Sequence, residues 1–117
     1  MSEDREHIDT TNLTVLKREL LKKARDSGSH RAAVTIYGGG DSVLRQTLIA
    51  LAAGAELGEH DSPPEATLQV LIGTITLYGD QRQWRMESGD HIQIPPERHS
   101  VIANEDSIFL LTAIRSV

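Results

Sequence analysis

The sequence predicts an all-β domain, a sandwich, jelly roll or barrel, preceded by one α-helix. Short runs of aliphatic and β-branched residues follow one another from residue 32 to residue 114. Turn-forming stretches such as Gly38–Asp41 and Pro95-Pro96 separate these runs. Only one segment has the spacing of apolar residues that is typical of a helix. Many short strands joined by such turns fit architectures that leave few sheet edges exposed.

The helix is expected at residues 13–26, after a flexible tail at residues 1–12. Its apolar positions recur at intervals of three and four residues, namely Leu13, Leu16, Leu20 and Ala24. Asn12 or Thr11 precedes the first of them and offers a side-chain oxygen as N-cap. Gly28 lies beyond the last turn. The tail is polar with almost no apolar anchor, so it has little to offset the entropy of ordering.

Seven strands are expected after the helix, within a barrel that spans about residues 31–116. Their ranges are 32–37, 44–51, 67–72, 74–78, 91–94, 100–103 and 108–114. The chain has 117 residues, a usual size for one domain, and no internal repeat or linker divides it. A single domain at residues 13–117 is therefore expected.

Composition excludes several classes of function. The formal net charge is −5, so the chain lacks the excess of Lys and Arg with which proteins neutralise phosphates, and nucleic acid is not expected as a partner. The sequence contains no cysteine, which leaves imidazole, carboxylate, amide or water as metal ligands. A basic leader followed by an apolar stretch is lacking, and no apolar run has transmembrane length. A cytoplasmic protein without a membrane partner is expected.

The run at residues 108–114, Ile-Phe-Leu-Leu-Thr-Ala-Ile, has apolar side chains at nearly every position. Alternate residues of a strand point to opposite faces, so one barrel interior cannot hold them all. A second copy packed on the outward residues would cover them in a homodimer with twofold symmetry. The predicted helix, folded back over the same surface, is the alternative cover.

Two glycine-bounded motifs occur in order along the strand region. In the first, Gly54 is followed after five residues by His60, and Gly73 closes the motif. In the second, Gly89 is followed after five residues by Pro95, and then by His99 in the run Pro-Pro-Glu-Arg-His. Together the motifs cover about residues 45–114. They resemble the two motifs of small single-domain cupins of the cupin 2 type, which are RmlC-like proteins. The resemblance implies a cupin-type double-stranded β-helix, a jelly-roll barrel, with one N-terminal α-helix, and such cupins are often dimeric.

The resemblance also implies a site inside the barrel, where cupin His and Glu side chains hold one divalent metal, iron, manganese, nickel or zinc. His60 and His99 match two of the family's ligands. Ser62 stands where the family has its second His, and Ala66 stands at the Glu position, with Glu65 as its neighbour. His60 and His99 are therefore the metal ligands or the ligand-binding residues, with Glu65 as a third metal ligand. The alternative is that each His forms only a local hydrogen bond at the barrel rim.

Two further polar residues are expected away from this pair. Gln69 lies three residues from Ala66, and an odd offset along a strand points to the opposite face. His91 opens an alternating segment and is expected on a solvent or interface face. Neither is expected to be a ligand.

The sequence thus predicts a cupin-fold protein that binds a small polar molecule, or weakly a divalent metal, in its barrel. One alternative is a metal-dependent dioxygenase or isomerase with a reduced ligand set. Another is a sensory or regulatory cupin, although no helix-turn-helix segment is present to bind DNA directly. Function resides in the site rather than in the barrel, so the fold does not choose among these.

Overall fold

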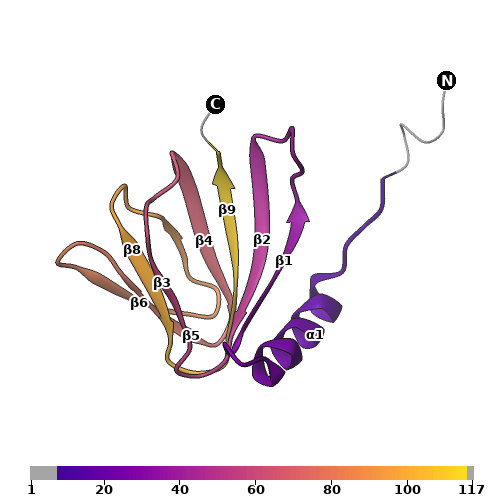
Figure 1. Ribbon diagram of the computed structural model, residues 1–117, viewed down its shortest axis with the longest axis horizontal. Coiled ribbons are helices and arrows are strands. Elements are labelled where there is room, and N and C mark those ends of the chain that lie inside the picture. Colours follow the sequence, from indigo (N-terminus) through magenta and orange to yellow (C-terminus); the bar gives the residue numbers. More distant parts are fainter. Residues whose placement is uncertain (1–7, 116–117) are drawn as a thin grey trace.

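The computed structural model describes residues 8–115, which form one helix and nine strands in two antiparallel sheets (Figure 1). The five-stranded sheet has the order β1-β2-β9-β4-β7 and the four-stranded sheet the order β3-β8-β5-β6. The elements are α1 (Leu13–Asp26), β1 (Arg31–Tyr37), β2 (Leu44–Leu51), β3 (Glu56–His60), β4 (Glu65–Ile72), β5 (Thr74–Tyr78), β6 (Gln83–Glu87), β7 (His91–Gln93), β8 (His99–Ala103) and β9 (Ser107–Ile114). The predicted tail falls partly on residues 1–7, which lie outside the described residues. No helix between residues 8 and 115 combines the length and the apolar character needed to span a membrane.

The two faces of the five-stranded sheet belong to different cores. In β2, Ile49 and Leu51 join the interior cluster between the sheets, whereas Leu48 and Ala50 join the cluster under the helix. This alternation is the period of two that a strand imposes on its side chains. The interior cluster consists of Ile49, Leu51, Ala66, Leu68, Val70, Ile75, Leu77, Met86, Ile94, Val101, Ala103 and Phe109. We call the face that contributes to this cluster the inner face, and the opposite one the outer face.

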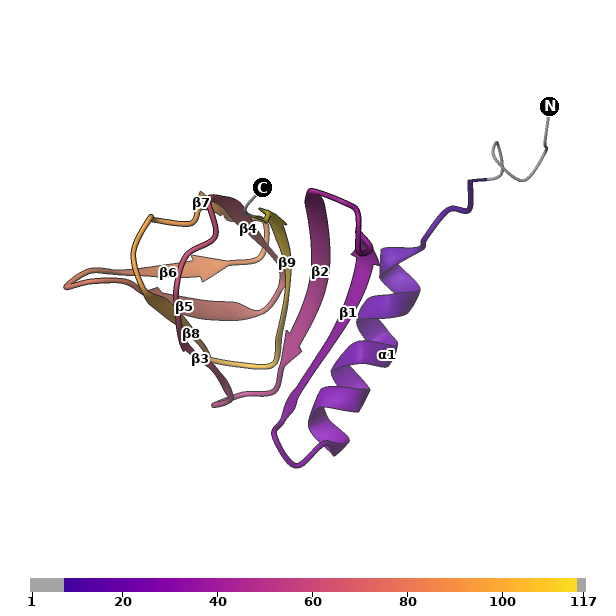
Figure 2. The same cartoon turned by 45° about the horizontal axis from the view of Figure 1, so that its top comes forward.

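Helix α1 covers part of the outer face of the five-stranded sheet, beside β1 and β2 (Figure 2). The Asn12 side chain accepts a hydrogen bond from the Val15 amide at 3.1 Å and begins the helix. Leu20 and Ala24 are buried and pack on the sheet. Their partners include Ile108 and Leu110 of β9. The helix therefore covers the outward residues Ile108 and Leu110 of β9, whereas outward Ile114 lies beyond it.

Two strands, β3 and β6, lie where the sequence analysis expected none. Strand β6 shows the alternation of a half-buried strand, because Trp84 packs against the interior and Met86 is buried within it. Strand β3 has only Leu57 as an inward apolar residue and contains a bulge before His60. The pattern in β6 is detectable in the sequence, whereas β3 depends on its pairing with β8.

Gly73 forms the tight connection between β4 and β5. Its φ is +87°, in the left-handed region that glycine adopts without steric cost. A Cβ at this position would overlap the backbone oxygen of Asp106 and the hydroxyl of Ser107. Ser107 is fully buried, and its hydroxyl accepts from the Thr74 amide and contacts the Thr74 carbonyl, each at 3.0 Å. The glycine that closes the first motif therefore lets β9 begin directly against this turn.

Candidate functional site

The structure brings His60 and His99 together. They face each other as a register pair between β3 and β8. Their ring centroids lie 4.3 Å apart, with an angle of 65° between the ring planes. In β8 the buried His99 shares a face with Val101 and Ala103, which belong to the interior cluster. Paired residues of an antiparallel ladder share a face, so the half-buried His60 faces the interior as well.

Backbone carbonyl groups fix the orientation of both rings. The Nδ1–H of His60 donates to the carbonyl oxygen of Gly58 at 2.7 Å, and the Nδ1–H of His99 donates to that of Glu97 at 2.9 Å. A carbonyl oxygen only accepts, so the proton of each neutral imidazole lies on Nδ1. Each Nε2 then carries a free lone pair. An Nδ1–H bonded to a backbone carbonyl is also the arrangement that orients histidine ligands of metals.

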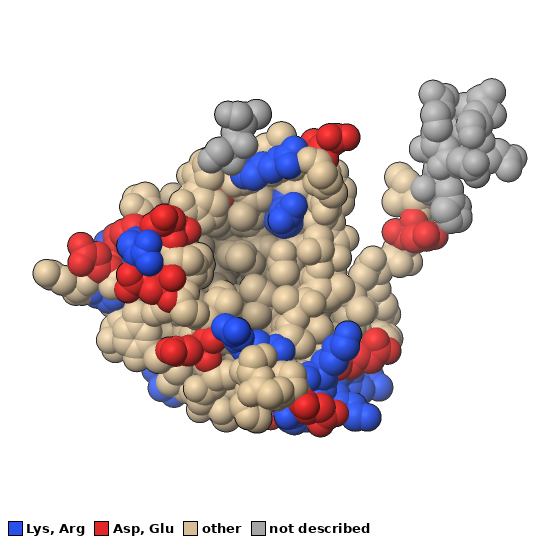
Figure 3. All heavy atoms as spheres, in the orientation of Figure 1, with Lys and Arg blue, Asp and Glu red and all other residues tan. Residues whose placement is uncertain are grey.

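The Nε2 atoms remain accessible. Within residues 8–115, neither Nε2 has a hydrogen-bond partner, and no side-chain nitrogen or oxygen is both fully buried and unpartnered. The space-filling view shows a hollow between the two sheets (Figure 3). The interior cluster between the sheets is mainly aliphatic, and Val101 and Ala103, on the same face of β8 as His99, belong to it. Two hydrogen-bond acceptors thus stand together beside a mainly aliphatic interior.

The structure does not bring Glu65 to the histidine pair. Ala66 is buried in the interior cluster, so its neighbour Glu65 points to the opposite face. Strand β4 already begins at Glu65, which leaves no loop in which the register could shift by one residue. The hydroxyl of Ser62, at the family's second His position, donates to the Pro63 carbonyl at 3.1 Å.

The described side chains do not fit a resident metal ion. No group of three or more His, Asp or Glu residues between residues 8 and 115 is placed to hold one. Structural and catalytic sites for zinc and similar ions use at least three protein ligands. Two imidazoles with a methyl group at the carboxylate position fall short of that set.

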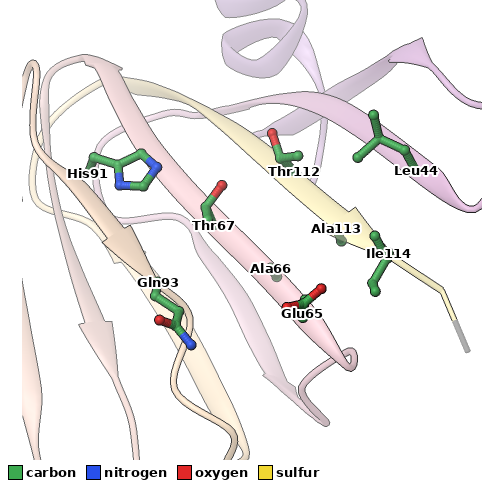
Figure 4. A pocket seen from close by; sticks show the side chains of 9 residues that line it. All are labelled: Leu44, Glu65, Ala66, Thr67, His91, Gln93, Thr112, Ala113 and Ile114. Atoms are coloured by element: carbon green, nitrogen blue, oxygen red, sulfur yellow. The ribbon is translucent and has the colours of Figure 1, made fainter.

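Glu65 instead lines a depression of about 440 Å³ on the outer face (Figure 4). Its other walls come from β2, β4, β7 and β9, with the residues Leu44, Ala66, Thr67, His91, Gln93, Thr112, Ala113 and Ile114. His91 pairs in register with Gln69, and both lie on this outer face, away from the histidine pair. Their placement agrees with the expectation from strand alternation.

Glu97 contacts both His99 and the turn between β5 and β6, a role that the sequence analysis missed. Its carboxylate accepts hydrogen bonds from the Arg82 side chain and the Asp80 amide in the turn between β5 and β6. The hydrogen bond from Arg82, followed by the one from Asp80, lowers the pKa of the Glu97 carboxyl. The Arg82 guanidinium lies 5.0 Å from the ring centroid of Trp84. The signal available in the sequence is a charged residue directly after the two prolines of the second motif.

A second group of ion pairs joins the segments that carry the two histidines. Arg98, next to His99, donates to Glu59 at 2.7 Å and to Asp61 at 2.9 Å. Glu59 and Asp61 flank His60. The hydrogen bond to Glu59 raises the pKa of Arg98. These side chains are exposed, so they stabilise the fold only weakly, but they hold the two strand ends in one register.

Comparisons with known proteins agree with this architecture. Neither a protein-family model nor a curated protein matches the sequence. Among solved structures, a conserved protein of unknown function from Streptococcus pyogenes is 25% identical with a TM-score of 0.74, over 95% of this chain and 90% of that one. A cupin-2 domain-containing protein from Shewanella frigidimarina is 16% identical with a TM-score of 0.66, over 91% of this chain and 95% of that one. Salicylate 1,2-dioxygenase from Pseudoaminobacter salicylatoxidans, solved as adducts with gentisate, is 19% identical with a TM-score of 0.74, over 89% of this chain but 32% of that one.

The two facing antiparallel sheets and these neighbours define a jelly-roll barrel of the cupin class. The chain has the fold of a small cupin domain, RmlC-like, as the resemblance of its two motifs predicted. At such identities the likeness concerns the fold, and the neighbours include both an enzyme and proteins without a stated activity.

Proposed function

We propose that the chain is a binding module whose hollow takes up a small polar molecule through the Nε2 atoms of His60 and His99. One observation carries the proposal: both rings donate Nδ1–H to backbone carbonyls, which leaves two acceptors side by side. A ligand with a hydroxyl group satisfies such acceptors. The aliphatic inner faces suit the apolar part of the same molecule, as in most small-molecule sites.

The metal ligands that the site offers favour a binding module over a metal-dependent dioxygenase or isomerase. Such an enzyme requires a third protein ligand, and the inward position nearest to the family pattern is occupied by Ala66. The likeness to the dioxygenase concerns the fold of about a third of that protein. Weak metal binding by the two imidazoles is retained as an outcome of the test.

Nuclear magnetic resonance of the histidine ring nitrogens tests the proposal. Spectra of the full chain should place the proton on Nδ1 in His60 and His99. Phenol, as a hydroxylated apolar probe, should shift the Nε2 signals of both rings. In His60→Ala and in His99→Ala, the signal of the histidine that remains should no longer shift with phenol. His91→Ala is the matched control, because its ring lies on the outer face, and it should leave the phenol response unchanged.

Two results would overturn the binding module. One is an absence of Nε2 shifts with phenol or a panel of other small alcohols. The other is near-stoichiometric iron, manganese, nickel or zinc in untagged protein that is lost in both histidine variants. The second result would move the assignment to the metal-dependent enzyme.

A further inference from the structure

Arg45 lies on the inner face of β2. It is near the exposed start of the strand, whereas the buried residues lie toward its other end. Residues alternate along β2, and Ile49 and Leu51 face the interior, so Arg45 faces the same way. Its register partner Ala113 packs against the interior cluster, which places Arg45 on that side independently. Arg45 is exposed, so its guanidinium is free to meet a ligand at the mouth of the hollow.

Arg115 joins Arg45 at the same place. The two residues line a cavity of about 200 Å³ together with Ala113 and Pro63. Pro63 belongs to the loop that follows His60 directly. The cavity therefore lies between the ends of β2 and β9 and the loop that follows His60.

Within residues 8–115, neither guanidinium takes part in an ion pair. The ion pairs found within residues 8–115 engage Arg25, Arg82 and Arg98 instead. Glu65, close in sequence to this region, points to the outer face. In a chain with a formal net charge of −5, two unpaired arginines that share one cavity form a local positive site. Lys and Arg side chains also border the hollow in the space-filling view (Figure 3).

We propose that Arg45 and Arg115 bind the carboxylate of the small molecule whose polar group reaches His60 and His99. This inference rests on the proposed function and names its ligand class, a small organic acid. The planar fork of a guanidinium donates two parallel hydrogen bonds to a carboxylate. The aliphatic inner faces beyond the cavity suit the carbon skeleton of an organic acid better than inorganic phosphate, the other anion that arginine recognises.

Calorimetric titration of the full chain with benzoate, its neutral counterpart benzamide and inorganic phosphate tests the assignment. Benzoate should bind at least tenfold more tightly than benzamide, and more tightly than phosphate. Arg45→Gln and Arg115→Gln should each remove most of this preference, whereas Arg45→Lys should retain part of it. Arg85→Gln, on β6 of the other sheet, is the matched control and should leave the preference intact.

The outcomes separate this inference from the function on which it rests. Equal affinity for benzoate and benzamide, with the phenol response of both histidines intact, overturns the carboxylate site alone. Phosphate binding as tight as benzoate binding overturns the choice of organic acids. Loss of the phenol response in Arg45→Gln would show that the arginine supports the fold of the site, and the carboxylate assignment would then fail.

Discussion

At the scale of single residues, the backbone does most of the positioning in this site. The carbonyl groups of Gly58 and Glu97 determine which nitrogen of each histidine is left without a hydrogen bond to the protein. Glu97 adds a second constraint, because its side chain holds the turn between β5 and β6 while its carbonyl holds His99. A single residue thus links the turn between β5 and β6 to one of the two histidines.

The lowered pKa of Glu97 predicts an acid-dependent loss of stability. Folding lowers this pKa through the hydrogen bonds from Arg82 and Asp80, so the unfolded chain binds the proton more readily. The resulting stabilisation is present above the ordinary pKa of a glutamate and is lost as the pH falls through the folded pKa. Melting temperatures between pH 7 and about pH 3 should therefore fall less steeply in Glu97→Gln than in the parent chain. Glu19→Gln, at an exposed position of the helix, is the control and should keep the slope of the parent chain. If Glu97→Gln also kept that slope, this role of Glu97 would be contradicted.

Replacement of Gly73 by alanine should destabilise the fold by about 3 kcal/mol, from the left-handed φ together with the overlap with backbone atoms. Chemical denaturation measures the change in the free energy of unfolding. Gly39→Ala is the matched control, because a Cβ there meets no atom within 4 Å and its φ is not in the left-handed region. Equal effects of the two substitutions would mean that the turn rearranges without cost.

At the scale of elements, the helix acts as a cover for the five-stranded sheet. Leu20 is 5% exposed and faces the sheet, whereas Val15 is 48% exposed. Asp106, before β9, accepts from the Ala53 amide and from Arg25 of the helix, and these bonds lower its pKa. Among the described residues, the helix is therefore held by an apolar contact and by the ion pair between Arg25 and Asp106.

Leu20→Ala should lower the free energy of unfolding by about 2–5 kcal/mol, the usual range for a buried leucine. Val15→Ala, on the exposed side of the same helix, should change it by less than about 0.5 kcal/mol. Denaturant melts followed by circular dichroism compare the two variants. If both substitutions had the same small effect, the helix would not be docked on the sheet in solution.

The elements differ in how far the sequence predicts them. Strands β2 and β9 combine apolar faces on both sides, one toward the interior and one toward the helix, and this gives a strong local signal. The segment Glu56–His60 has little apolar content, so its strand depends on partners that are remote in sequence. Glycine and proline spacing predicted that His60 and His99 belong to one site. The acceptors of their Nδ1–H groups are backbone atoms, whose directions follow from the fold and not from residue types.

At the scale of the whole molecule, the homodimer stays a prediction. The structure changes the surface on which a second copy is expected to pack. The helix already covers Ile108 and Leu110 of β9, so the surface left for a second copy is the outer face around the depression, formed by β4, β7 and the end of β9. Light scattering at micromolar concentration should give about twice the chain mass of 12.9 kDa. Thr67→Arg, within the depression, should shift the mass toward the monomer, and Val15→Arg on the helix should not. A mass of 12.9 kDa for the parent chain would end the dimer proposal.

The methyl group of Ala66 also makes the barrel a starting point for engineering. Ala66 faces the interior, as the two histidines do, and a carboxylate introduced there by Ala66→Glu would offer a third ligand beside the two imidazoles. Such a carboxylate would be buried, so it should destabilise the apo protein. Zinc should then restore stability by binding only the folded state, so the melting temperature should rise with zinc and fall with chelator. The parent chain should respond to neither, and a design that turns this barrel into a metalloprotein would then need one substitution.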